Sequence, residues 1–231
     1  MEQATAIIVA GGKGTRMGLE IKKQYVLLEG KEVLAHTIEK FEQVEEIEEI
    51  IVVVSREEIE FVEQEICKKY GFNKVHKVVA GGKERQDSVY EGLKQAGNAK
   101  YVLIHDGARP FVKGSMIKKI VEEVKEKKAC VVGVRVKDTI KECQDQTQKV
   151  TSTLKREKLW SVQTPQAFEK ELLQKAYQFA KEKNIVGTDD SSLVEKMGQE
   201  VFMVQGDYLN LKITTKEDLL FAKEILKMQK K

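Results

Sequence analysis

The residues best suited to chemistry lie in a glycine-rich stretch near the start of the chain, AGGKGTRMG, which follows the apolar residues 6–10. Glycines let the backbone approach a phosphate group and direct N–H groups toward it. Lys13 and Arg16 add positive charge, and an arginine can hold phosphate through two parallel hydrogen bonds. Lys22 and Lys23 follow in the segment EIKKQY. Cations gathered around glycines in this way indicate a polyphosphate-binding site, whereas a plain glycine-rich turn would explain the glycines alone.

Two common phosphate-binding motifs do not fit this stretch. The P-loop pattern GxxxxGK[ST] occurs nowhere in it, and the dinucleotide pattern GxGxxG fails at its third glycine, because Gly18 comes one residue late. The predicted strand 50–55 is followed by Arg56 rather than by the acid expected for NAD. An arginine there could suit NADP, so an NADP-dependent oxidoreductase remains an alternative. Its support is weak, since the single Tyr-x-x-x-Lys match, Tyr70 to Lys74, crosses a helix stop.

A second chemical segment, HDGARPF, follows a predicted strand at residues 101–106. Asp106 ends that strand at the edge where open parallel sheets bind ligands, and it could hold Mg²⁺ together with phosphate oxygens. Arg109 adds an anion contact, and the following proline favours an extended backbone there. The alternative is that Asp106 caps a turn and pairs with Arg109. We expect His105 to pack or hydrogen-bond rather than to act as a catalytic base.

Four further polar positions could contribute to the same edge. Ser88, in AGGKERQDSV, could read a base edge, or the segment could simply cap a helix. Arg156, in KREKLW, could reach a neighbouring subunit or be a solvated surface charge. Thr188 and Asp189 form an expected helix start, and helix capping alone would explain them. Lys212 follows the last predicted strand in LNLKITT, where a lone lysine indicates little by itself.

The elements that position these residues alternate between strand and helix patterns. This alternation predicts an α/β domain over residues 1–231, with a mostly parallel sheet and helices on both faces. The expected strands are 6–10, 50–55, 77–80, 101–106, 129–136 and 201–207. The expected helices are 31–44, 56–71, a helix within 81–97, 115–128, 168–183, 188–198 and 216–231.

The alternation breaks over residues 137–160, where the sequence is polar with short alternating apolar positions around QDQTQ. We interpret this segment as a β-hairpin arm that projects from the sheet. The alternative is a solvated surface loop.

Composition narrows the function classes. The 231 residues include 40 basic and 37 acidic side chains, and the resulting net charge of +3 does not favour a nucleic-acid-binding protein. Three cysteines without CxxC spacing argue against a disulfide framework or a zinc site. The sequence has no apolar run of 18 residues and no secretion signal, so we expect no membrane span and a cytoplasmic location.

Taken together, the motifs resemble those of the 2-C-methyl-D-erythritol 4-phosphate cytidylyltransferase family. They are AGGKGTRMG with KKQY, AGGKERQDSV, HDGARPF, VKDTI, LKREKLWSVQTPQAF, GTDDSSLVE and YLNLKITT, in that order. The resemblance implies a Rossmann-like nucleotidyltransferase fold, with a β-arm that interlocks two subunits of a homodimer. It also implies CMP transfer from CTP to the methylerythritol phosphate, in non-mevalonate isoprenoid synthesis. A sibling family that makes CDP-ribitol from ribitol 5-phosphate remains an alternative.

The resemblance also implies a role for each matching residue. Arg16, Lys23 and Lys212 would be the catalytic cations, and Asp106 would bind Mg²⁺ or another divalent cation. The nucleotide would contact Ala10, Gly11, Gly12, Gly14, Thr15, Gly82, Lys83 and Ser88. The acceptor would contact Arg109, Thr139, Arg156 and Thr188, with Thr139 and Arg156 supplied by the second subunit. In one departure, Lys22 stands where the family usually has proline, and it would either loosen the loop or add a third cation.

Overall fold

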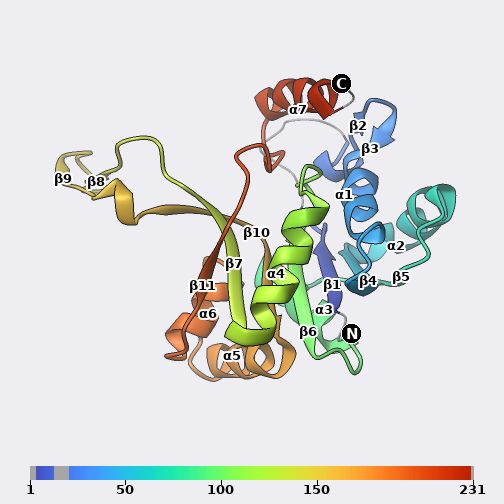
Figure 1. Cartoon of the computed structure of the whole chain (residues 1–231), viewed down its shortest axis with the longest axis horizontal. Coiled ribbons are helices and arrows are strands. Elements are labelled where there is room, and N and C mark those ends of the chain that lie inside the picture. The colour runs from blue at the N-terminus through green and yellow to red at the C-terminus, as the bar shows by residue number, and fades with distance from the viewer. Residues whose placement is uncertain (1–3, 13–20, 230–231) are drawn as a thin grey trace.

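The centre of the fold is a seven-stranded sheet, seen in a computed structural model that describes residues 4–12 and 21–229 (Figure 1). The strand order is β11-β7-β10-β6-β1-β4-β5. Neighbouring strands are parallel except for β10, which runs antiparallel to both β6 and β7. The predicted mostly parallel sheet is therefore confirmed. Its strands are β1 (Ala4–Val9), β4 (Ile47–Val54), β5 (Val75–Ala80), β6 (Tyr101–Asp106), β7 (Ala129–Arg135), β10 (Trp160–Glu169) and β11 (Phe202–Gln205).

Helices cover both faces of this sheet, as expected. The α-helices are α1 (Val33–Glu42), α2 (Ile59–Phe61), α3 (Arg85–Gln95), α4 (Gly114–Lys127), α5 (Lys170–Glu182), α6 (Asp190–Lys196) and α7 (Lys216–Gln229). The other helical segments are η2 (Lys23–Tyr25), η3 (Arg56–Glu58), the π-helical η4 (Val62–Lys68) and η5 (Arg156–Lys158). The predicted helix 56–71 is thus divided into 3-10, α and π turns. Gly71 ends it with a φ of +66°, which a glycine adopts without strain.

Alternating side chains of the strands form a core on each face of the sheet. In β4, Ile50 and Val52 pack toward α1 and α4, whereas Ile51 and Val53 pack toward α3 and α5. Strands buried on both faces read as continuous β-branched runs, which explains why this strand was evident from sequence. A third, smaller core packs α7 against the short hairpin of β2 (Leu27–Leu28) and β3 (Lys31–Glu32).

Strand β10 is the main difference from the expected elements. It enters the middle of the sheet between β6 and β7, where the sequence indicated only the end of the arm and then a helix from residue 168. The helix begins instead at Lys170. Polar Gln163, Thr164 and Gln166 are buried in β10, and the pairing register with β7 shifts between Val162 and Gln166. That irregularity accommodates Pro165, which lacks the N–H needed for a regular ladder.

The predicted arm is confirmed as a hairpin that stands away from the sheet. Its strands are β8 (Lys141–Cys143) and β9 (Val150–Thr153), which pair antiparallel and extend to the left in Figure 1. Apolar side chains on the arm, including Val150 and Leu154, are exposed in the single chain.

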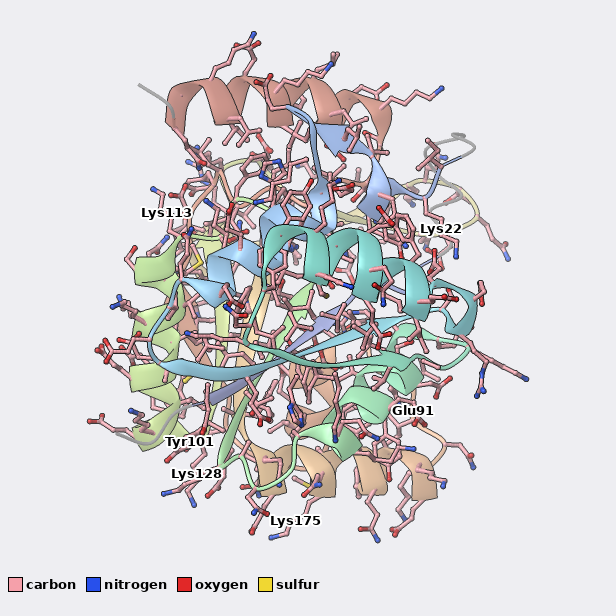
Figure 2. All side chains as sticks on the ribbon, turned by 90° about the vertical axis from the view of Figure 1, so that its right-hand side faces the viewer. Lys22, Glu91, Tyr101, Lys113, Lys128 and Lys175 are labelled. Carbon is pink, nitrogen blue, oxygen red and sulfur yellow. The ribbon has the colours of Figure 1, made fainter. Side chains whose placement is uncertain are left out.

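The parallel strands all point toward one end of the molecule. Figure 2 shows Tyr101 and Lys128, at the amino ends of β6 and β7, near α5 and its Lys175. Lys22 and Lys113, which follow carboxyl ends of strands, lie toward the opposite end. The three cysteines are free thiols. Among the helices of the described ranges, none combines the length and the apolar character needed to span a membrane.

Candidate functional site

A buried carboxylate, Asp106, lies at the centre of the carboxyl edge of the sheet. Its Oδ2 atom is 2.8 Å from Lys212 Nζ and 3.4 Å from Arg109 Nε, and its Oδ1 atom is 3.4 Å from Arg85 Nε. These cations come from the segment after β11, the turn after β6 and the first turn of α3. Asp106 is only 7% exposed, so one negative charge is largely removed from water and surrounded by three positive ones.

The charges around Asp106 decide its protonation state. Burial by itself would raise the pKa of this carboxyl group, but Lys212, Arg85 and Arg109 outweigh that effect and hold its pKa well below the usual range. Asp106 is therefore an anion at neutral pH. Arg85 also contacts the buried carboxylate of Asp190 at 2.8 Å, so three cations face two carboxylates and an excess of positive charge remains, which suits the site to an anionic ligand.

A chain of hydrogen bonds beneath Asp106 fixes its backbone. The Asp106 N–H donates to Thr164 Oγ1 at 3.1 Å, and that hydroxyl is 3.0 Å from His105 Nδ1. His105 Nε2 is 3.2 Å from the carbonyl oxygen of Arg109, which can only accept, so this nitrogen carries the proton and Nδ1 accepts from Thr164. Burial lowers the pKa of His105 to about 3. The neutral, fully hydrogen-bonded imidazole is a positioning group, as expected from the sequence.

Asn210 holds the segment that carries Lys212. It is fully buried, and its Nδ2 donates to the carbonyl oxygen of Thr164 at 2.9 Å and to Gln163 Oε1 at 3.2 Å. Its own carbonyl oxygen accepts from Arg109 Nη1 at 2.8 Å. Asn210 therefore connects β10 to two of the three cations around Asp106.

The first residues of the amino-terminal glycine loop are anchored by side chains from outside it. Gln24 Nε2 donates to the carbonyl oxygen of Ala10 at 2.7 Å and to that of Gly12 at 3.4 Å. Ser55 Oγ donates to the carbonyl oxygen of Gly11 at 3.4 Å. Lys23 begins η2, directly before Gln24. The predicted nucleotide-binding residues Gly14 and Thr15, and the predicted catalytic Arg16, lie outside the described residues.

Lys22 is paired with acidic side chains of η3. Its Nζ atom is 2.9 Å from Glu58 Oε1, 3.6 Å from Glu57 Oε1 and 3.3 Å from Ser55 Oγ. These contacts link the segment just before η2 to η3.

The second glycine pair lies where α3 begins. An added Cβ atom at Gly81 would be 2.6 Å from Ser88 Oγ, and one at Gly82 would be 2.3 Å from Asp87 Cβ, so both positions require glycine. Ser88 Oγ donates to the carbonyl oxygen of Glu84 at 3.0 Å, and Glu84 and Asp87 form a capping box. The expectation of a capped helix start is confirmed, and Lys83 is exposed beside it.

Three predicted acceptor-binding residues, Thr188, Thr139 and Arg156, are exposed at the surface and do not belong to the group of three cations around the buried carboxylate. Thr188 is exposed directly before Asp189, the N-cap of α6. Thr139 and Arg156 are exposed on the arm, which extends away from the sheet (Figure 1). Arg156 Nη1 donates to the carbonyl oxygen of Lys137 within the arm at 3.0 Å.

Several residues of the site were not found from the sequence. Arg85 lies in a helix cap, Gln163 and Thr164 lie in the unexpected strand β10, and Asn210 lies in a loop. Only the local motif ERQDS hinted at Arg85, and it gave no sign of a contact with Asp106. Within the described ranges, no group of three or more acidic, histidine or cysteine side chains could hold a metal ion by itself.

Comparisons with known proteins agree on one family. Residues 4–228 match the sequence profile described as 2-C-methyl-D-erythritol 4-phosphate cytidylyltransferase. A protein of that name from Clostridioides difficile is 51% identical over 98% of this chain and 95% of its own length. Another from Alkaliphilus oremlandii is 47% identical over 100% of this chain and 98% of its own length.

A solved structure extends this similarity to the fold. The crystal structure of a 4-diphosphocytidyl-2C-methyl-D-erythritol synthase from Anaerococcus prevotii has a TM-score of 0.86 and 34% identity, and the match covers 98% of this chain and 96% of that one. The Rossmann-like nucleotidyltransferase fold is thereby confirmed. These matches favour a nucleotidyltransferase over the NADP-dependent oxidoreductase.

We predict that Asn210→Ala destabilises the protein by roughly 2 kcal/mol, because it removes two donated hydrogen bonds and leaves buried acceptors in β10 without their donor. Urea unfolding at pH 7 measures this change. Gln178→Ala, an exposed glutamine on α5, is the matched control and should shift the unfolding free energy by less than about 0.5 kcal/mol. Equal stabilities for Asn210→Ala and the wild type would contradict the anchoring role.

Proposed function

This chain belongs to the 2-C-methyl-D-erythritol 4-phosphate cytidylyltransferase family, and we propose that the site around Asp106 transfers CMP from CTP to that acceptor. The products are 4-diphosphocytidyl-2-C-methyl-D-erythritol and pyrophosphate, in non-mevalonate isoprenoid synthesis. Beside the family match, one observation carries the proposal. A buried, ionised carboxylate lies among three cations at the carboxyl edge of the sheet. The two glycine segments begin at the same edge, directly after β1 and β5.

The reaction needs charge stabilisation more than proton transfer. A phosphate oxygen of the acceptor attacks the α-phosphorus of CTP, the new P–O bond forms, and pyrophosphate leaves in line with its bonding electron pair. The nucleophile is already an anion, so the step needs no general base. This agrees with His105, which is neutral and engaged on both ring nitrogens. Preorganised cations lower the barrier by stabilising the charge that develops on phosphate oxygens.

The nucleotide half of the site would use both glycine segments. Arg16 and Lys23 would neutralise the triphosphate, and the backbone of the first loop would surround it. Gly82, Lys83 and Ser88 would lie beside the cytosine and ribose. Ordered loop positions 10–12 and the glycine-dependent start of α3 support this assignment. The full set for the first loop is Ala10, Gly11, Gly12, Gly14 and Thr15.

Asp106 would hold a magnesium ion together with the phosphates of CTP. Mg²⁺ usually binds through one or two carboxylates plus substrate phosphates, so a single ionised carboxylate at this edge fits the ion's preferences. When bound, the metal would neutralise charge on the transferring and leaving phosphates. Lys212 Nζ is 2.8 Å from Asp106 Oδ2, so this lysine would lie beside both the ion and the acceptor phosphate.

The acceptor half would be completed by a second copy of the chain. Arg109, Thr188 and Lys212 would bind the acceptor phosphate from one subunit, and Thr139 and Arg156 would reach it from the arm of the other. The exposed apolar side chains on the arm support a homodimer, because they are otherwise left in water. A cytoplasmic location is also proposed, and it is supported by three cysteines that remain free thiols.

Pyrophosphate release tests the proposed function directly. We expect the protein with CTP and Mg²⁺ to release pyrophosphate with methylerythritol 4-phosphate and to do so far more slowly with ribitol 5-phosphate. Each acceptor is assayed separately, with omission of the acceptor as the blank. Faster release with ribitol 5-phosphate would overturn the proposed identity of the acceptor, whereas the proposed transfer of CMP from CTP would still hold.

Removing either cation assigned to the triphosphate should strongly slow the reaction. We predict that Arg16→Met and Lys23→Met each lower kcat by about 10²–10³, the usual effect of deleting one preorganised charge-stabilising donor. Steady-state assays at saturating CTP measure kcat. Lys175→Met, on α5 at the opposite end of the sheet, is the control and should retain the wild-type rate. A near-wild-type kcat in either site variant would contradict its assignment.

Subunit mixing tests whether the arm acts across the dimer. Arg156→Ala and Lys23→Ala are each expected to be inactive alone. Heterodimers of the two should regain up to about half of the wild-type activity per dimer, because one of the two sites then contains both native residues. Differently tagged chains allow the heterodimer to be purified before the assay. No activity in a purified heterodimer would place Arg156 in the site of its own subunit.

A further inference from the structure

The segment that carries Thr188 is tied to the rest of the protein by side chains from three other elements. Residues 185–191 include the end of the α5–α6 connection and the first two residues of α6. They pack closely, since an added Cβ atom at Gly187 would lie 2.6 Å from both Leu193 Cδ2 and Ser192 Oγ. Thr188 itself is exposed. Its position is therefore set by the residues that hold its neighbours, and not by contacts of its own side chain.

Gln86 holds the amino-terminal side of this segment with both ends of its carboxamide. Its Nε2 donates to the carbonyl oxygen of Ile185 at 3.3 Å, and its Oε1 accepts from the N–H of Gly187 at 3.0 Å. These two backbone groups lie within the three residues before Thr188. Gln86 belongs to the first turn of α3, between the predicted cytidine-binding residues Lys83 and Ser88.

Arg85, the preceding residue, holds the other side of the segment. Its Nη2 atom is 2.8 Å from Asp190 Oδ2, and its Nε atom is 3.4 Å from Asp106 Oδ1. Asp190 is 1% exposed, and its Oδ1 accepts from the Tyr177 hydroxyl at 2.6 Å. One guanidinium thus joins the central carboxylate of the site to a buried carboxylate two residues after Thr188.

Strand β10 holds the same segment through the side chain of Gln166. Gln166 Nε2 donates to Asp189 Oδ2 at 2.7 Å, and Gln166 Oε1 accepts from the N–H of Ser191 at 3.1 Å. Asp189 in turn caps α6 by accepting from the N–H of Ser192 at 2.9 Å. Gln166 holds the start of the helix, whereas Arg85 and Gln86 set the segment's distance from Asp106 and from the start of α3.

We propose that Arg85 and Gln86 are positioning residues that place Thr188 for the phosphate of the acceptor, relative to Asp106 and to the nucleotide-binding start of α3. The proposal rests on the proposed function of the site. These two consecutive residues of one helical turn then connect the nucleotide half of the site to its acceptor half. Neither residue needs to touch the acceptor, because both act through the backbone or the carboxylate that flanks Thr188.

Gln86→Ala tests the proposal with little risk to folding, because it removes two hydrogen bonds at a partly buried position. We expect the KM for the acceptor to rise about tenfold, in line with the loss of two ordinary hydrogen bonds that hold its binding segment. The KM for CTP should stay within about twofold of wild type, since the glycine pair and the cap of α3 are unchanged. Gln178→Ala on α5 is the matched control and should alter neither KM.

Amide hydrogen exchange gives a second readout that does not depend on catalysis. Exchange of the Gly187 N–H should accelerate about tenfold in Gln86→Ala, because its acceptor is lost, while the Ser192 N–H held by Asp189 should be unaffected. Faster exchange at Gly187 with an unchanged KM for the acceptor would overturn the proposal. Equal rises in both KM values would also overturn it, as they would show a general structural defect.

A double-mutant cycle tests the part played by Arg85. If Arg85 acts through Asp190, the double variant Arg85→Met with Asp190→Asn should have a kcat/KM for the acceptor no lower than Arg85→Met alone. It should also unfold at a higher temperature than Arg85→Met, because the unpaired buried carboxylate is gone. Multiplicative losses of kcat/KM in the double variant would overturn this link.

The wild-type assays separate the two levels of the proposal. If the wild type releases pyrophosphate with neither polyol phosphate, the proposed function fails and the positioning role fails with it. If the wild type is active and Gln86→Ala keeps its KM for the acceptor, only the positioning role is overturned.

Discussion

The buried carboxylate of Asp106 is the group on which the arrangement of the site depends. A carboxylate at 7% exposure is stable only when opposite charges and hydrogen bonds replace the water that it has lost. Lys212, Arg109 and Arg85 supply those charges from three separate parts of the chain. The same requirement holds three cations close together, although they would otherwise repel one another. This positively charged edge of the sheet is therefore organised by contacts within the protein itself, as electrostatic preorganisation requires.

Strand β10 links this charge cluster to the core. Its antiparallel course between β6 and β7 brings polar Gln163, Thr164 and Gln166 into the middle of the sheet, where each has partners. Thr164 fixes the backbone of Asp106, and Gln166 fixes the start of α6. Buried polar groups of this kind are favourable only when they are satisfied, which couples the ordering of residues 189–191 to the folding of the sheet.

Much of the fold was predictable because its causes are local. The β-branched run of β4 records burial on both faces of the sheet. The helical periodicity of α1 and α4 records burial of one side of each helix against one of those faces. The polar composition of residues 137–160 likewise indicated an arm outside the core. Strand β10 was missed because a buried strand that contains Gln163, Thr164, Pro165 and Gln166 has neither an apolar run nor an alternating pattern.

The sequence alone determined the alternation of elements, the two glycine segments and the candidates Asp106 and Arg109, since each follows from residue type and order. Lys212 became a candidate only through the resemblance to the family's motifs. Only the tertiary structure decided how these residues pair. It showed that Arg85 bridges Asp106 and Asp190, and that Lys22 pairs with Glu58. The physical reason is that both are contacts between residues far apart in the chain. Their partners are selected by the packing of strands and helices, which no local pattern of residues records.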